Sequence, residues 1–260
     1  MDSKVDLQPA YILHSRPYRD TSAIVDFFTQ DYGRVSAVAN GARRAKSPWR
    51  AALQPFRLVL VSWKGKSDLK SVRDVDLGET PYPLGGKALL SGMYLNELIV
   101  RLTHRFVGHP GLFDTYQQTL GKLSEDPICD DGIDSRREFK VRYHIETQLR
   151  QFELGLLEEL GYGLCLDREA DGVTVIKSDG TYRFDDQHGF EWVEGIVPVD
   201  WMGLCFSGQS LLSLSKRCYD NETILKDAKR LMRLALAPHL GGKPLESRKL
   251  FLGPNTEPQS

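Results

Sequence analysis

Two strand-like runs and a cluster of cations follow one another in SAIVDFFTQDYGRVSAVANGARRAK, residues 22–46. Residues 22–29 and 34–39 are rich in β-branched and aromatic side chains, which favour strands, and Tyr32-Gly33 supplies the turn between them. The stretch therefore predicts a β-hairpin that runs directly into a basic loop.

The hairpin belongs to a set of five predicted strands. The other three cover residues 10–15, 56–63 and 69–77, with Gly65 in the turn between the last two. Five strands within about 80 residues, joined by short turns and by one long loop over residues 40–53, predict a small closed barrel. The OB-fold is the five-stranded barrel that most often binds oligonucleotides, and an SH3-like barrel fits the same pattern.

The pattern changes at PYPLGG, residues 81–86, because Pro and Gly stop both strands and helices. Apolar residues then recur at helical spacing, which predicts helices over about 89–102, 110–123 and 134–160, the last capped by Gly161. Three shorter strands and two further helices, the second capped by Asn221, follow. The strands are expected at residues 173–176, 181–184 and 190–193, and the first of the two helices near 208–218.

The expected fold class is therefore α+β. We expect an N-terminal OB-fold barrel over residues 1–80 and a mainly helical domain over residues 81–250, with a small β insertion at about 163–198. Residues 251–260 are expected to form a disordered tail.

Composition excludes several protein classes. The chain has 260 residues, 41% hydrophobic and 27% charged, and a mean hydropathy of −0.35, which is typical of soluble globular proteins. No apolar stretch approaches the ~20 residues that span a bilayer, and the N-terminus lacks the apolar core of a secretory signal. The four cysteines form no close pairs of the kind that structural zinc sites use. We expect a cytoplasmic protein with free thiols, no metal and no membrane partner.

The formal charge of −1 hides a strongly basic segment. Residues 34–73 hold ten Lys and Arg side chains and one acid, Asp68, for a net charge of +9. Cations neutralise phosphates and release counterions, while aromatic residues such as Trp49, Trp63 or Tyr32 can stack on bases. Nucleic acid is therefore the leading candidate partner. In the alternative interpretation, Trp49 is a core residue and the cations form a solvated rim.

No catalytic site is recognisable in the sequence. Gly241-Gly242-Lys243 lacks the earlier glycine of a phosphate-binding loop, and the next residue is Pro244. Asp130, Asp131 and Asp134 are better explained as helix caps than as a magnesium site, so a nuclease is a distant alternative. We expect a protein that is not an enzyme and uses no cofactor.

Seven short motifs, in order along the chain, carry a family resemblance. GRV (33–35), NGARR (40–44) and LQPF (53–56) resemble the N-terminal domain of the RecO family of bacterial recombination mediators. The remaining motifs resemble the family's later part and extend the resemblance to roughly residues 10–250. They are YLNEL (94–98), LFDTY (112–116), FELGLL with LGY (152–162) and PLESR (244–248).

The resemblance implies an OB-fold followed by a helical domain. It implies binding of single- and double-stranded DNA, annealing of complementary strands, and action with RecR to load RecA on DNA coated by single-stranded-DNA-binding protein (SSB). It implies a bacterial, nucleoid-associated protein that is not an enzyme. Many family members carry a four-cysteine zinc module, but the spacing of Cys165, Cys205 and Cys218 resembles the zinc-free branch.

Candidate DNA contacts are the cations of the barrel and of the last long helix. Those on the barrel are Arg34, Arg43, Arg44, Lys46, Arg50, Lys64 and Lys66. Those at helical spacing after Asn221 are Lys226, Lys229, Arg230 and Arg233, for which a solvated helix face is an equal alternative.

The family resemblance also implies a site for the acidic, Phe-ending tail of SSB. Such a tail needs a cation for its carboxylate, for which we choose Arg150, and an apolar slot for its ring. Leu112, Phe113 and Tyr116 are the candidates for the slot, with a plain core role as the alternative. Two rival functions stay open: a protein-only scaffold and an RNA-binding OB-fold protein.

Overall fold

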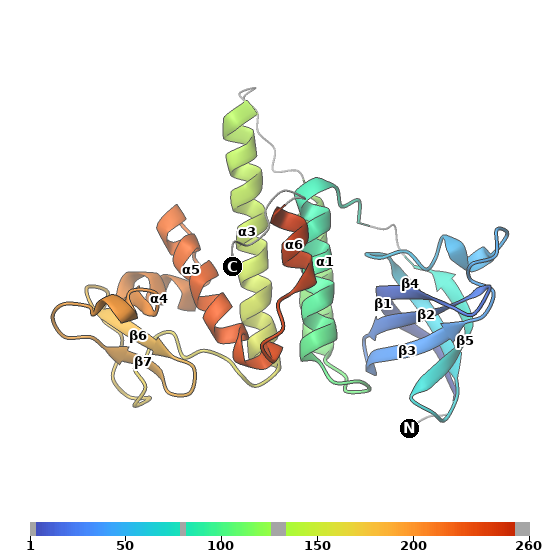
Figure 1. The fold of residues 1–260 in the computed structure, drawn as a ribbon, viewed down its shortest axis with the longest axis horizontal. Coiled ribbons are helices and arrows are strands. Elements are labelled where there is room, and N and C mark those ends of the chain that lie inside the picture. Colours follow the sequence, from blue (N-terminus) through green and yellow to red (C-terminus); the bar gives the residue numbers. More distant parts are fainter. Residues whose placement is uncertain (1–3, 79–81, 126–133, 253–260) are drawn as a thin grey trace. The chain divides into compact units, whose positions relative to one another are not determined.

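The computed structural model describes residues 4–78, 82–125 and 134–252 (Figure 1). The chain divides into two compact units, residues 1–126 with 245–260 and residues 127–244. The domain boundaries predicted at residues 80 and 250 remain predictions. The predicted tail lies outside the described residues except for its first two positions, which belong to a helix.

Residues 4–77 form the closed barrel that the sequence predicts. Its strand order is β1-β2-β3-β5-β4, with β3 and β5 parallel and the other neighbours antiparallel. This is the OB-fold arrangement, so the predicted fold class is confirmed. The strands are β1 (Lys4–Tyr18), β2 (Ser22–Thr29), β3 (Gly33–Ala39), β4 (Leu58–Lys64) and β5 (Leu69–Leu77).

Strand β1 is much longer than predicted because it pairs with two neighbours. Its first part, residues 4–11, pairs with β4, and its second part, residues 10–18, pairs with β2. Alternate side chains along each strand fill the barrel. In β2 and β3 the buried side chains that do so are Ala23, Val25, Phe27, Val35, Ala37 and Ala39.

Three helices complete the first unit: α1 (Gly86–Leu102), α2 (Pro110–Ser124) and α6 (Glu246–Leu252). Helix α2 packs on the outside of β1 and β2 through aromatic rings. Tyr11 and Phe28 of the strands contact Phe113 and Tyr116 of the helix at centroid distances of 5.1–5.9 Å. These rings bury a large apolar area, so they hold helix and barrel together.

Asn96 of α1 provides the polar counterpart of this aromatic contact. Its buried side chain donates a hydrogen bond to the carbonyl of Leu13 at 3.0 Å and accepts one from the Tyr116 hydroxyl at 2.5 Å. One amide thereby connects α1, α2 and β1.

Glu97, the next residue of α1, holds α6. Its carboxylate accepts hydrogen bonds from the backbone N–H groups of Glu246 and Ser247, both at 2.8 Å, and from the Ser247 hydroxyl at 2.6 Å. Burial alone would raise the pKa of Glu97, but these hydrogen bonds outweigh it and lower the pKa. The carboxylate thus caps the start of α6 from a position about 150 residues earlier in the chain.

The segment between α1 and α2 closes one end of the barrel. Phe106 packs against the barrel core, and its backbone N–H donates to the carbonyl of Arg34 at 3.0 Å. A Cβ atom on Gly33 would lie 1.7 Å from the Val107 carbonyl oxygen, and one on Gly108 would lie 2.3 Å from that of Asp31. Both glycines are required because backbone meets backbone here.

In its described residues, the second unit combines three α-helices and two short 3₁₀ helices with a small sheet. The α-helices are α3 (Asp134–Glu159), α4 (Gly208–Ser215) and α5 (Glu222–Leu236). The predicted cap of α3 is confirmed: Gly161 has φ +82°, and the N–H of Tyr162 donates to the carbonyl of Leu157 at 2.8 Å. The predicted cap of α5 is confirmed as well, because the Asn221 side chain accepts from Ile224 N–H at 3.0 Å.

The sheet has the order β7-β6-β8, with β6 (Thr181–Asp185), β7 (Gly189–Trp192) and β8 (Cys205–Ser207). The prediction of a strand at residues 173–176 is wrong. The Asp171 carboxylate accepts hydrogen bonds from Val173 N–H, Thr174 N–H and the Thr174 hydroxyl, so the chain turns instead of extending. The third strand, β8, is too short to give an alternating pattern.

No helix in the described residues is long and apolar enough to cross a membrane.

We predict that Gly33→Ala destabilises the protein by at least about 3 kcal/mol. The new Cβ would overlap the Val107 carbonyl, and alanine would also have to adopt the left-handed backbone conformation of Gly33. Gly41 is the matched control: its φ of +74° is similar, but a Cβ there meets nothing closer than 3.5 Å. Gly41→Ala should cost only about 1–2 kcal/mol in urea unfolding. Equal losses would show that the approach of Val107 to Gly33 contributes nothing.

We also predict that Asn96→Ala lowers the free energy of unfolding by about 1–3 kcal/mol, because a buried donor and a buried acceptor are lost together. Gln118→Ala on the exposed face of α2 serves as the control and should change it by less than about 0.5 kcal/mol. Calorimetric or urea unfolding of both variants checks this, and an unchanged stability of Asn96→Ala would contradict it.

Candidate nucleic-acid interface

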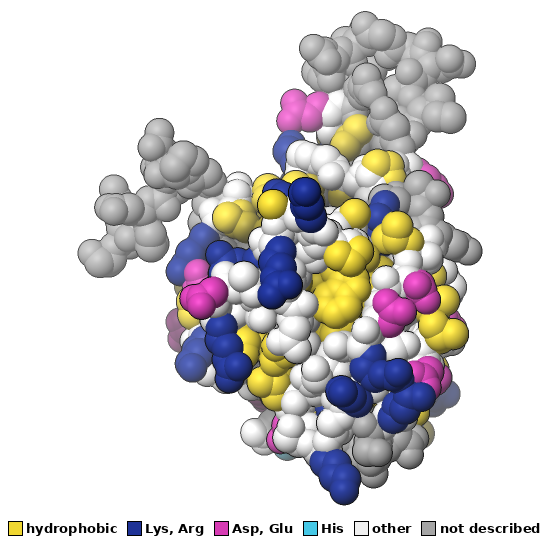
Figure 2. Space-filling model, turned by 90° about the vertical axis from the view of Figure 1, so that its right-hand side faces the viewer, with side chains coloured by type: hydrophobic (Ala, Val, Ile, Leu, Met, Phe, Trp, Pro, Cys, Tyr) yellow, Lys and Arg dark blue, Asp and Glu magenta, His cyan; other side chains and the backbone are white. Residues whose placement is uncertain are grey.

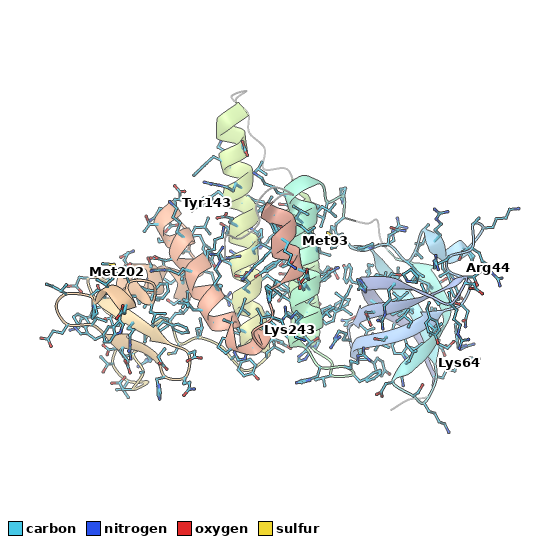
Figure 3. The ribbon with its side chains drawn as sticks, viewed as in Figure 1. Arg44, Lys64, Met93, Tyr143, Met202 and Lys243 are labelled. Atoms are coloured by element: carbon cyan, nitrogen blue, oxygen red, sulfur yellow. The ribbon has the colours of Figure 1, made fainter. Side chains whose placement is uncertain are left out.

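The structure divides six of the predicted barrel cations into two exposed groups. The loop group, Arg43, Arg44, Lys46 and Arg50, follows the end of β3, and the turn group, Lys64 and Lys66, lies where β4 turns into β5. Because β3 and β5 run parallel, with Ser36 level with Leu69, the two groups lie at opposite ends of the barrel. Figure 3 shows Arg44 and Lys64 projecting outward at separate places on the same side of the barrel.

The face that these side chains occupy is both cationic and apolar. In Figure 2, Lys and Arg side chains surround a patch of hydrophobic atoms, and Asp and Glu are fewer. Phosphates bind cationic groups, and bases stack on apolar ones. A face with both kinds of group therefore suits single-stranded nucleic acid.

The basic loop is anchored to the barrel. It contains a short 3₁₀ helix, Pro48–Arg50, and it buries Ala42, Ala52 and Leu53 in the barrel core. Trp49 packs partly against the same core, as the alternative interpretation expected. The cations of the loop group therefore stand on a fixed base, which limits the conformational entropy lost when a ligand binds.

Sequence reasoning missed Arg19, which adjoins the loop group. Arg43 donates its backbone N–H to the Thr21 carbonyl at 2.9 Å, and its guanidinium lies 3.4 Å from the Arg19 carbonyl. The exposed Arg19 side chain lies over the Tyr18 ring at 5.1 Å. The turn between the first two strands is a known ligand-binding loop of OB-folds, and that knowledge could have found this residue.

Three aromatic or cationic side chains of the basic segment make contacts within the barrel unit. Trp63 fills the barrel interior with the edge of Tyr32 against it, so it cannot stack on a base. Lys70, one of the ten cations of the basic segment, is 2% exposed and donates to the Gly65 carbonyl at 3.1 Å. Arg57 donates to the Ala51 carbonyl at 3.2 Å. Because Lys70 is buried, fewer than ten of these cations lie on the surface.

Arg34 is half-buried and serves the fold. Its guanidinium donates to the Thr103 carbonyl, at the end of α1, at 3.0 Å. Burial lowers the pKa of Arg34, and the positive charge of Arg105 lowers it further. Arg34 is therefore less available to a phosphate than the loop group.

The four predicted cations of α5 have different roles. Arg230 is structural: it donates to the carbonyls of Met202 and Cys205, at 2.9 and 2.7 Å, and lies over the Phe206 ring. Lys229 pairs with Glu146 at 3.1 Å. Lys226, which pairs with Glu222 at 3.2 Å, and Arg233 are both exposed.

Arg150 of α3 is buried and pairs with Glu153 at 2.8 Å. It is not a surface cation. The candidates for the apolar slot, Leu112, Phe113 and Tyr116, are buried core residues of the first unit. A role of these four residues in binding the SSB tail stays a prediction.

No group of three or more His, Cys, Asp or Glu side chains that could hold a metal occurs in the described part of the chain. Cys165, Cys205 and Cys218 are free thiols, and Cys129 lies outside the described residues.

Comparison with known proteins gives a consistent assignment. Residues 4–80 match the family model described as the N-terminal domain of recombination protein O. Over 96% of its length, the chain is 42% identical to the whole of a DNA repair protein RecO of Coxiella burnetii. It is 39% identical to the corresponding proteins of Proteus mirabilis and Vibrio cholerae, covering 94% of this chain and 91% and 93% of theirs. The chain therefore belongs to the DNA repair protein RecO family.

Proposed function

We propose that this chain binds DNA through its barrel and acts in recombinational repair by annealing complementary strands. The observation that carries the proposal is the loop group: four exposed cations on an anchored loop of an OB-fold, beside Arg19 of the neighbouring turn. Membership of a family whose relatives are named DNA repair proteins supports DNA as the ligand.

The mechanism needs no catalytic group. Two complementary strands repel each other through their phosphates, and a cationic surface reduces this repulsion while releasing counterions. The two groups lie at opposite ends of a barrel whose strand β3 has seven residues, or about 23 Å. We propose that one strand crosses this face and leaves its bases accessible for pairing.

We further propose that the protein acts on DNA coated by SSB and cooperates with RecR to help load RecA. Recognition of the acidic SSB tail is assigned to Arg150, whose Nε has no hydrogen-bond partner among the described residues. Since Arg150 is paired with Glu153, a carboxylate of the tail would have to compete with that of Glu153 for the guanidinium.

We predict that changing Arg43, Arg44 and Lys46 together to Ala reduces the slope of log affinity against log salt by about 2–3, because each lost phosphate contact removes nearly one unit. Annealing of complementary oligonucleotides, without ATP or metal, should slow in parallel. The matched control replaces three exposed lysines elsewhere, Lys140, Lys216 and Lys249, with Ala, which changes the net charge equally.

If the slope of log affinity against log salt is the same in both triple variants, the loop group does not contact DNA. Absence of DNA binding by the unaltered chain at low salt would overturn the proposed function and favour a protein-only scaffold. Tighter binding of a matched RNA oligomer would favour the RNA-binding alternative.

For the SSB tail, we predict that the double change Arg150→Met with Glu153→Leu abolishes binding of an acidic peptide that ends in Phe, while DNA binding persists. Both members of the pair are changed because removing Arg150 alone would leave a buried carboxylate uncompensated, at a cost of about 3–5 kcal/mol. Fluorescence anisotropy with the labelled peptide measures this. Peptide binding at the level of the unaltered chain would exclude Arg150 from the site.

A further inference from the structure

The second unit carries a lobe that DNA binding does not explain. We define the acidic lobe as residues 163–207, which contain the β6–β7–β8 sheet. It has nine acidic and three Lys or Arg side chains, for a net charge of −6. The three cations are already engaged: Arg183 pairs with Glu191, Lys177 lies over the Trp192 ring, and Arg168 donates to the Val173 carbonyl. The charge that the lobe presents to a partner is therefore negative.

The connection between β7 and β8, residues 193–204, also exposes large apolar side chains. Ile196 is 95% exposed, Val199 79% and Met202 61%. Single exposed apolar residues are normal, but several in one short connection usually mark a contact surface. Glu194 and Asp200, both exposed, lie within the same connection and give it its acidic character.

Hydrogen bonds and a ring contact hold the second half of this connection in place. Trp201 N–H donates to the Pro198 carbonyl at 3.0 Å, and Leu204 N–H to the Trp201 carbonyl at 2.8 Å. The Arg183 guanidinium lies 4.5 Å from the Trp201 ring centre. Arg230 of α5 donates to the Met202 carbonyl, and Phe184 N–H to that of Leu204. These contacts fix the part of the connection that carries Val199 and Met202.

The barrel of a second copy of this chain offers a surface complementary to the β7–β8 connection. An acidic apolar segment fits an apolar patch with a cationic border, and the barrel face of Figure 2 has that composition. We propose that the β7–β8 connection of one copy docks on the cation-bordered barrel face of a second copy. Since the loop group also carries the proposed DNA contacts, DNA displaces the docked connection; this competition alone rests on the proposed function.

Such a contact is heterologous, because each copy uses two different surfaces. It has no built-in closure, so the mass of the assembly should rise continuously with protein concentration. Its attraction is largely electrostatic at the border, so it should weaken as salt increases.

The test is sedimentation of the full chain at low salt over about 1–100 µM, a range suited to a small interface. We expect the average mass to rise with concentration and to fall when salt is added. Ile196→Ser with Val199→Ser should weaken association at least about tenfold, since two apolar contacts are lost. The matched control, Val173→Ser with Val175→Ser, changes two exposed valines in another part of the lobe and should leave association unchanged.

A mixing experiment excludes misfolding as the cause of any loss. The lobe variant, Ile196→Ser with Val199→Ser, keeps its barrel face. The barrel variant, Arg43→Ala with Arg44→Ala and Lys46→Ala, keeps its lobe. At concentrations where each variant alone is monomeric, a mixture should form a 1:1 complex and nothing larger, because only one pair of intact surfaces remains. A mixture that stays monomeric overturns the proposal, as does an unaltered chain that is monomeric throughout.

Addition of a single-stranded oligonucleotide should lower the average mass of the unaltered chain. If the chain self-associates but the oligonucleotide has no effect, the competition fails while the docking stands. If DNA binds but no self-association occurs, the docking fails while the proposed function stands.

Discussion

The first unit depends on one place where two stretches of backbone meet without side chains between them. Gly33 begins β3, and Val107 belongs to the segment between α1 and α2; no side chain fits between them. This approach brings Phe106 to the barrel end and allows the Arg34 guanidinium to reach the carbonyl of Thr103. The aromatic contact of α2 and the hydrogen bonds of Asn96 then act on elements that are already in register. A barrel of this size has few apolar residues, so its attachment to helices adds buried area that it could not supply alone.

The predicted cations separate according to whether the fold already uses them. Arg34, Arg150 and Arg230 each bond to carbonyl or carboxylate oxygens of their own unit, and these bonds would have to break before a ligand could bind. The loop group stands on a buried base but extends into solvent. A guanidinium has several donors in a rigid plane, which makes it as useful for joining segments as for binding phosphate. Charge counts along a sequence cannot distinguish the two uses.

Much of the fold could be predicted from local pattern. Residues 22–29 are a strand, and Gly161 and Asn221 are caps, because alternation and capping chemistry act over a few residues. The errors arise where individual side-chain contacts decide, and not alternation. Lys70 is only 2% exposed although Leu69 beside it is exposed, and residues 173–176 turn around Asp171. The site shares this limit: Arg19 joins the loop group only through the packing of two turns, which no spacing in the sequence records. Two of the family-like motifs, by contrast, are explained by the structure. Glu97 of YLNEL (94–98) accepts hydrogen bonds from Glu246 and Ser247 of PLESR (244–248).

The bonds between Glu97 and α6 bear on the order in which the chain can fold during synthesis. The first unit contains residues from both ends of the chain, and the whole second unit is inserted between them. The barrel and α1 leave the ribosome early. The carboxylate of Glu97 cannot form its hydrogen bonds with Ser247 until that residue has left the exit tunnel. The acidic lobe is therefore made, and can fold, while the first unit is still incomplete. Completion of the first unit therefore follows synthesis of the whole second unit.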